Sequence, residues 1–152
     1  MLYFHACPIL LATGSIISPG NFGRIINAAG PQHSLWEREQ ILEHIRASEF
    51  SYKPSRLHAC FIFETGESAK FFRDKHWPMN IIYSAEIVDI NAPIHHGDFN
   101  CLPPIAGCSL SMEDVARRYW LDNLKIQIVE YPNLECREVV TSSPIRICNA
   151  CG

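Results

Sequence analysis

Runs of apolar residues, separated by turn-forming ones, divide the chain into short strands and amphipathic helices. The clearest strand covers residues 57–64, which are apolar and rich in aromatics, and Thr65 and Gly66 end it. Glu67 then begins a helix, because an acidic side chain is favourable at the positive N-terminal end of a helix. The plainest interpretation of this unit is a core strand followed by an amphipathic helix.

The same unit also predicts a binding slot. A strand, a turn and a helix in this order bring Phe61, Ser68 and Phe71 within reach of one another. Two aromatic faces and one hydroxyl group suit a planar ring that carries an amide. We therefore treat this slot as a candidate site and core packing as its alternative.

The remaining pattern predicts further strands at 2–6, 80–88, 126–129, 138–141 and 145–148. One helix is expected from about 35 to 47 behind a capping box of Ser34 and Glu37. Another follows Ser111, with an apolar stripe that ends in Tyr119-Trp120. The turn-rich residues 9–34 and 90–110 are expected to be loops. The prediction is a single α+β domain over residues 1–152 with peripheral helices.

Composition narrows the classes of function. Of the 152 residues, 47% are hydrophobic, which is enough for a core without disulfides or metal. The net charge is −3 and the pI is near 6.1, so a nucleic-acid partner would need a local basic patch. We find no signal peptide and no membrane-spanning apolar run, and the seven cysteines are odd in number. We therefore expect reduced thiols, a cytoplasmic location and no membrane contact.

Metal binding and cysteine chemistry are the first candidates for a site. Cys148 and Cys151 form a CxxC pair, but a structural zinc site normally has two close pairs, and this pair lies where fraying is expected. Further ligands could come from His95, His96, Cys101 and Cys108. Cys60 lies within a strand and Cys7 precedes a proline, so neither position favours a nucleophile. We predict no metal site and keep an interaction module with a small zinc site as an alternative.

Three groups of motifs follow one another along most of the chain. They are Tyr3-Phe4-His5-Ala6 with Leu10-Leu11 and Gly14-Ser15-Ile16-Ile17, then Ala59-Cys60-Phe61-Ile62-Phe63 with Ser68-Ala69-Lys70-Phe71, and last Glu138-Val139-Val140 with Pro144-Ile145-Arg146-Ile147. Their order and spacing resemble the ADP-ribosyltransferase superfamily, in particular its poly(ADP-ribose) polymerase branch. Pro54-Ser55-Arg56-Leu57 and Tyr119-Trp120 resemble motifs of a family of small bacterial proteins of unknown function, assigned to this superfamily.

The resemblance implies an enzyme that breaks the nicotinamide–ribose bond of its co-substrate NAD and transfers ADP-ribose to a protein or nucleic-acid acceptor. It also implies split antiparallel sheets with His5, Phe61 and Glu138 facing one cleft. A role as a bacterial toxin or phage-defence component would add a cognate antitoxin or inhibitor protein as a partner. The alternative is a catalytically inactive module of the same fold that binds NAD, another nucleotide or a protein.

The resemblance further assigns roles to single residues. Glu138 would bind the nicotinamide ribose and stabilise the developing cation, with His5 and Phe61 completing the catalytic set. NAD would be held by the ribose-binding His5, the backbone of Ala6 at the carboxamide, the stacking rings of Phe61 and Phe71, the hydroxyl of Ser68 at the amide, and Arg24 or Arg56 at the pyrophosphate. No metal ligand is implied.

Two positions depart from the family pattern. Phe61 stands where the family has Tyr, which keeps the stacking face but removes the hydrogen bond of the phenol. Ala6 stands where the family has Gly, which adds a Cβ close to the nicotinamide ring.

Plainer interpretations stay open for the same side chains. His5 would be a satisfied core histidine, and Glu138 a solvated carboxylate at a strand edge. The rivals of Glu138 for the catalytic role are Glu130 and Glu135. Arg56 would simply pair with Glu64 or Glu49.

Overall fold

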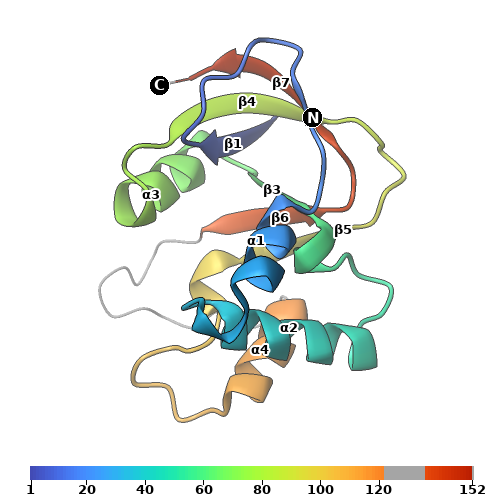
Figure 1. Cartoon of the computed structure of the whole chain (residues 1–152), viewed down its shortest axis with the longest axis vertical. Coiled ribbons are helices and arrows are strands. Elements are labelled where there is room, and N and C mark those ends of the chain that lie inside the picture. The colour runs from blue at the N-terminus through green and yellow to red at the C-terminus, as the bar shows by residue number, and fades with distance from the viewer. Residues whose placement is uncertain (122–135, 152) are drawn as a thin grey trace.

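The computed structural model describes residues 1–121 and 136–151, which form an α+β protein (Figure 1). Within these ranges one antiparallel sheet contains seven strands in the order β2-β7-β4-β1-β3-β6-β5. The strands are β1 (Tyr3–Cys7), β2 (Ile16–Ile17), β3 (Cys60–Phe63), β4 (Ile81–Ile87), β5 (Ile94–Asp98), β6 (Arg137–Thr141) and β7 (Ile145–Ala150). The helices are α1 (Asn21–Ala29), α2 (Trp36–Glu49), α3 (Gly66–His76) and α4 (Met112–Leu121), with short 3₁₀ helices η1 (Gly30–Gln32), η2 (Arg56–His58) and η3 (Phe99–Cys101). The α+β class and the antiparallel pairing are confirmed.

The sheet is continuous, so the prediction of two separate sheets is wrong. All five residues of β1 pair with β4 on one side. On the other side β1 pairs with β3 at one position, where Phe4 lies opposite Phe63. Beyond this pair the two strands part, and Figure 1 shows β3, β6 and β5 crossing below the layer of β7, β4 and β1. We call this opening, between His5 on β1 and Phe61 on β3, the fork.

Three apolar clusters hold the elements together. One fills a face of the bent sheet around Ile62, Tyr83 and Ile147. A second lies between α2 and α4, which Figure 1 shows side by side, and a third lies under α3. Consecutive residues Ile82 to Ala85 of β4 are buried, because alternate side chains face different clusters. β4 is therefore covered on both faces.

The predicted helices are present, but one predicted cap is wrong. α2 begins at Trp36 without a side-chain cap, so Ser34 and Glu37 form no capping box. The chain enters α2 directly from the turn of η1, and the N–H of Trp36 donates to the carbonyl of His33. Ser111 does cap α4, since its Oγ accepts the N–H of Asp114 at 3.2 Å.

Regular structure occurs inside both predicted loops. α1 lies within 9–34, and its ends coincide with turn residues Pro19-Gly20 and Gly30, the last with φ +63°. Gly23 lies mid-helix because α1 packs against η2: a Cβ there would lie 1.8 Å from the carbonyl oxygen of Leu57. β5 lies within 90–110, where His95-His96-Gly97 has weak strand propensity but pairs along β6.

The strand predicted over 57–64 is shorter than expected. β3 covers Cys60–Phe63, and η2 precedes it because Ser55 Oγ accepts the N–H of Leu57 at 3.2 Å and starts a turn. The strand predicted at 126–129 lies outside the described residues. Among the described helices, none has the length and apolar character needed to cross a membrane.

Candidate functional site

His5 occupies the fork. Its Nδ1 lies 2.9 Å from the carbonyl oxygen of Phe61, where a regular ladder would have joined the two backbones. A carbonyl oxygen can only accept, so Nδ1 carries the hydrogen and Nε2 is left as an acceptor. Burial lowers the pKa of His5 below its ordinary value, although the bond to Phe61 opposes this. The ring is therefore neutral near pH 7 and suited to accept a hydroxyl hydrogen.

Phe61 links the fork to a buried arginine. The guanidinium of Arg56 lies over the Phe61 ring, 4.9 Å from the centroid. Phe22 of α1 meets the same ring edge to face at 5.3 Å. The ring is only half-buried, so part of it stays open to a ligand. A stacked nicotinamide would have to share this ring with Arg56.

Arg56 is the centre of a buried polar network, which we call the Arg56 network: Arg56, Glu39, Tyr119 and Glu138. Its Nε donates to both oxygens of Glu39, at 3.0 and 3.3 Å. Its Nη1 donates to Glu138 and, at 2.7 Å, to the hydroxyl of Tyr119. Burial alone would lower the pKa of Arg56, but Glu138 and Glu39 outweigh it and raise the pKa well above the ordinary value. The guanidinium is permanently charged.

Glu138 lies on β6 and is 2% exposed. Its Oε1 accepts from Arg56 and, at 2.6 Å, from the hydroxyl of Tyr119. Both bonds from the described residues end on this one oxygen, so Oε2 accepts no hydrogen bond from those residues. Glu138 is therefore not the solvated edge carboxylate of the plainer interpretation.

Glu39 was not foreseen. It is fully buried on α2, and Nη2 of Arg38 donates to its Oε1 at 2.8 Å. Burial alone would raise the pKa of Glu39, but Arg56 and Arg38 outweigh it and leave the pKa below its ordinary value. The signal for this residue was present in the sequence, since Glu39 falls four residues after Leu35 and three before Leu42, inside the apolar stripe of the predicted helix.

The other predicted NAD contacts differ in how deeply they are buried. Ser68 is buried at the start of α3, where its Oγ accepts from the hydroxyl of Thr65 at 3.0 Å. Phe71 is half-buried against the cluster under α3, and Ala6 packs against the same cluster. Arg24 is exposed on α1 and donates to Asn21 at 2.9 Å. Of the two predicted pyrophosphate contacts, Arg24 is the one at the surface.

Contacts join the three predicted catalytic residues into one chain, from His5 to Phe61, from Phe61 to Arg56 and from Arg56 to Glu138. Arg56 pairs with Glu39 and Glu138, so its predicted pairing with Glu64 or Glu49 is wrong. Its buried guanidinium is held by these carboxylates, which argues against a pyrophosphate role.

The remaining carboxylates named from the sequence have other partners. Glu64 pairs with His96 and Glu49 pairs with Arg117. The rivals Glu130 and Glu135 lie outside the described residues.

Metal ligands do not gather in the described part of the chain. Within residues 1–121 and 136–151, no group of three or more His, Cys, Asp or Glu side chains could hold an ion. His95 is buried instead, with Nε2 donating to the carbonyl of Tyr119 at 3.1 Å and Nδ1 accepting from Lys53 at 3.2 Å. Burial and the neighbouring Lys53 lower the pKa of His95 to about 3. It is a neutral structural histidine.

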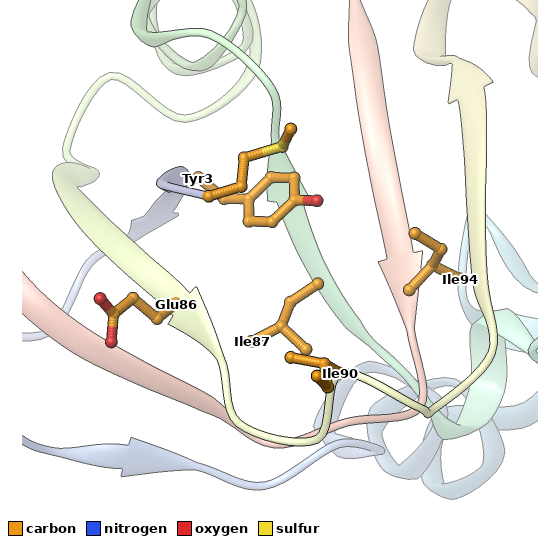
Figure 2. A pocket seen from close by; sticks show the side chains of 6 residues that line it. Tyr3, Glu86, Ile87, Ile90 and Ile94 are labelled. Atoms are coloured by element: carbon orange, nitrogen blue, oxygen red, sulfur yellow. The ribbon is translucent and has the colours of Figure 1, made fainter.

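A surface cavity of about 240 Å³ lies between the start of β1, the end of β4 and the start of β5 (Figure 2). Its lining residues are Met1, Tyr3, Glu86, Ile87, Ile90 and Ile94. None of them is a predicted site residue. This cavity is therefore a different feature from the slot predicted beside Phe61.

The fold and the Arg56 network define an α+β protein in which buried ion pairs of Arg56 join the antiparallel sheet, at Glu138, to the helix pair, at Glu39. A family model described as "Protein of unknown function (DUF2441)" matches residues 12–135. Because this covers most of the chain, the protein belongs to the DUF2441 family. The matched range contains Glu39, Arg56 and Tyr119, whereas His5 and Glu138 lie outside it. No curated protein matches the sequence.

Proposed function

We propose that the protein is an NAD-dependent ADP-ribosyltransferase with an ADP-ribosyltransferase-like fold. The observation that carries the proposal is the contact chain from His5 through Phe61 to Arg56 and Glu138. These residues come from segments far apart in sequence, and three of them hold the motif positions expected of such an enzyme. The acceptor is a protein or nucleic acid, and an antitoxin or inhibitor protein is the expected regulatory partner.

The side chains fit the chemistry of NAD. Neutral His5 offers Nε2 to ribose hydroxyls, Phe61 and Phe71 offer rings to nicotinamide, and Arg24 offers a charge to the pyrophosphate. The bond between C1′ of the ribose and the ring nitrogen breaks, and its electron pair leaves with nicotinamide. The acceptor nucleophile then forms the new bond to C1′. Glu138 Oε2 binds the 2′-hydroxyl and stabilises the positive charge that develops on the sugar.

A second candidate is an NAD-binding module of the same fold without catalysis. It is favoured by the ion pair between Glu138 and Arg56, because a paired carboxylate stabilises a neighbouring cation less than a free one does. The two candidates share NAD binding and differ in turnover.

The test measures binding and turnover on the same preparation. Calorimetry gives the affinity for NAD, and chromatography follows nicotinamide release with and without cell extract as a source of acceptor. Binding with release supports the enzyme. Binding without release, even with extract, selects the second candidate, and the absence of NAD binding refutes both.

A further inference from the structure

The hydroxyl of Tyr119 lies between a permanent donor and an acceptor. Arg56 Nη1 donates to this oxygen at 2.7 Å, and the hydroxyl itself lies 2.6 Å from Glu138 Oε1. Arginine cannot accept and an ionised carboxylate cannot donate, so the phenol hydrogen must point to Glu138. Burial raises the pKa of Tyr119 well above its ordinary value, with Glu138 adding to the rise and Arg56 opposing it, so the hydrogen stays in place. The direction of this bond is fixed.

The ring that carries this hydroxyl is fixed as well. His95 donates to the backbone carbonyl of Tyr119 at 3.1 Å, and the indole N–H of Trp120 donates to the carbonyl of Leu42 at 2.9 Å. The rings of Tyr119, Trp120 and His95 pack with centroids 4.8–5.1 Å apart. The last turn of α4 is therefore tied to both β5 and α2.

Gly97, on β5, makes room for the ring of Tyr119. It lies directly opposite Glu138 in the ladder between β5 and β6. A Cβ on Gly97 would lie 2.6 Å from Cε2 and 2.9 Å from Cζ of Tyr119, closer than real Cβ atoms come. The absence of a side chain at this position thus lets the phenol reach the carboxylate of the residue opposite.

We propose that Tyr119 is a positioning residue for Glu138, and that Gly97 leaves the space that the ring of Tyr119 requires. The hydroxyl holds Oε1 so that Oε2 keeps one orientation toward the fork. This inference rests on the proposed function, because it concerns how the carboxylate of that reaction is oriented. Tyr119 acts through Glu138 and does not itself touch the substrate.

The kinetic test uses Tyr119→Phe, which keeps the ring and removes the hydroxyl. Misplacement of a reacting group by about 1 Å costs up to about 100-fold in rate, so kcat for nicotinamide release should fall about 10- to 100-fold. The KM for NAD should change less than about threefold, since the loss falls on the transition state. Tyr52→Phe, which removes an exposed hydroxyl (Tyr52 is 73% exposed), is the matched control and should keep full kcat. Unchanged kcat in Tyr119→Phe overturns the inference.

Gly97→Ala tests the space for the ring. It should lower kcat in the wild-type background and add little in the Tyr119→Phe background, where no hydroxyl is left to displace. Gly66→Ala is the control, because its Cβ would meet Phe4 at an ordinary 3.6 Å. Independent, multiplicative losses from Gly97→Ala and Tyr119→Phe contradict the proposed role of Gly97.

A stability cycle separates failure of this inference from failure of the proposed function. If the wild type releases no nicotinamide, the proposed function fails. The hydrogen bond between the Tyr119 hydroxyl and Glu138 is then tested by urea unfolding of Tyr119→Phe, Glu138→Met and the double variant. A real hydroxyl–carboxylate bond makes the midpoint loss of the double variant smaller than the sum of the single losses. Additive losses overturn the inference whatever the activity.

Discussion

Replacement of Arg56 by Met tests whether the Arg56 network holds the helix pair to the sheet. Arg56 is 3% exposed and pairs with two carboxylates, Glu39 and Glu138, that are 0% and 2% exposed. Loss of one partner from a buried pair costs about 3–5 kcal/mol when the other charge stays buried. In Arg56→Met, Glu39 keeps its pair with Arg38, and Glu138 keeps only the hydroxyl of Tyr119 among the described residues. For a chain of this length such a loss lowers Tm by about 6–20 °C. Methionine keeps most of the volume, so little of this loss comes from a cavity.

Urea unfolding followed by circular dichroism measures the loss. Arg117→Met is the control, since Arg117 forms an exposed pair with Glu49 that should contribute nothing measurable. If Arg56→Met unfolds at the same urea concentration as Arg117→Met, the network does not stabilise the fold and this reasoning is refuted.

The same comparison has a predicted dependence on pH. The pKa of Glu39 is below its ordinary value in the folded state. The charge of Glu39 therefore stabilises the fold at pH values above the unfolded pKa, and this stabilisation is lost as the pH falls through the folded pKa. Without Arg56 the buried carboxylate of Glu39 takes up a proton more readily. The gap in stability between wild type and Arg56→Met should therefore narrow as the pH falls toward and below 4.5, the ordinary pKa of Glu39. A gap that widens would contradict the assignment of buried charge.

Three further predictions concern single positions. Phe61→Ala should weaken NAD binding about 5- to 150-fold in calorimetry, since stacking on one ring is worth about 1–3 kcal/mol, whereas Phe61→Tyr should keep binding. His95, with a folded pKa of about 3, should stay neutral in nitrogen NMR down to pH 5. Because the unfolded chain takes up that proton nearer pH 6.5, stability should fall as pH drops below this value, and His95→Gln should flatten the slope. Gly23→Ala should cost about 1–3 kcal/mol or more in urea unfolding, because its Cβ would meet the Leu57 carbonyl at 1.8 Å, while Gly66→Ala should be tolerated.

Elements with strong local patterns could be predicted from the sequence. The unit around Phe61 and the helix of α4 follow apolar periodicity, and α3 begins at Gly66, one residue before the expected start at Glu67. α1 and β5 could not be found in this way, because their stability comes from partners distant in sequence. Gly23 weakens a helix in isolation, but a Cβ there would collide with the backbone of η2. Gly97 weakens a strand, but a Cβ there would collide with the ring of Tyr119 and lie 3.0 Å from Nε2 of His95.

The candidate site was predicted only in part, because its contacts also join residues that are distant in sequence. Motif order pointed to His5, Phe61 and Glu138, and contacts link all three. Helical periodicity assigned Tyr119 to the core, which is correct for its ring, but periodicity carries no information about what its hydroxyl meets. The partner of Glu138 is Arg56, which lies 82 residues earlier, and no local pattern encodes such a pair.

Nicotinamide release by the wild type and by Glu138→Gln tests the central claim most directly. Glutamine keeps the shape of Glu138 and removes its charge, so the account predicts a retained fold, retained NAD affinity and a kcat lower by about 10²–10³. Glu113→Gln on the exposed face of α4 is the control, and Glu130→Gln and Glu135→Gln test the rivals. Full turnover in Glu138→Gln, with turnover lost in Glu130→Gln or Glu135→Gln, would show that another carboxylate is catalytic. If the wild type releases no nicotinamide even with cell extract present, the proposal that the protein is an enzyme is contradicted.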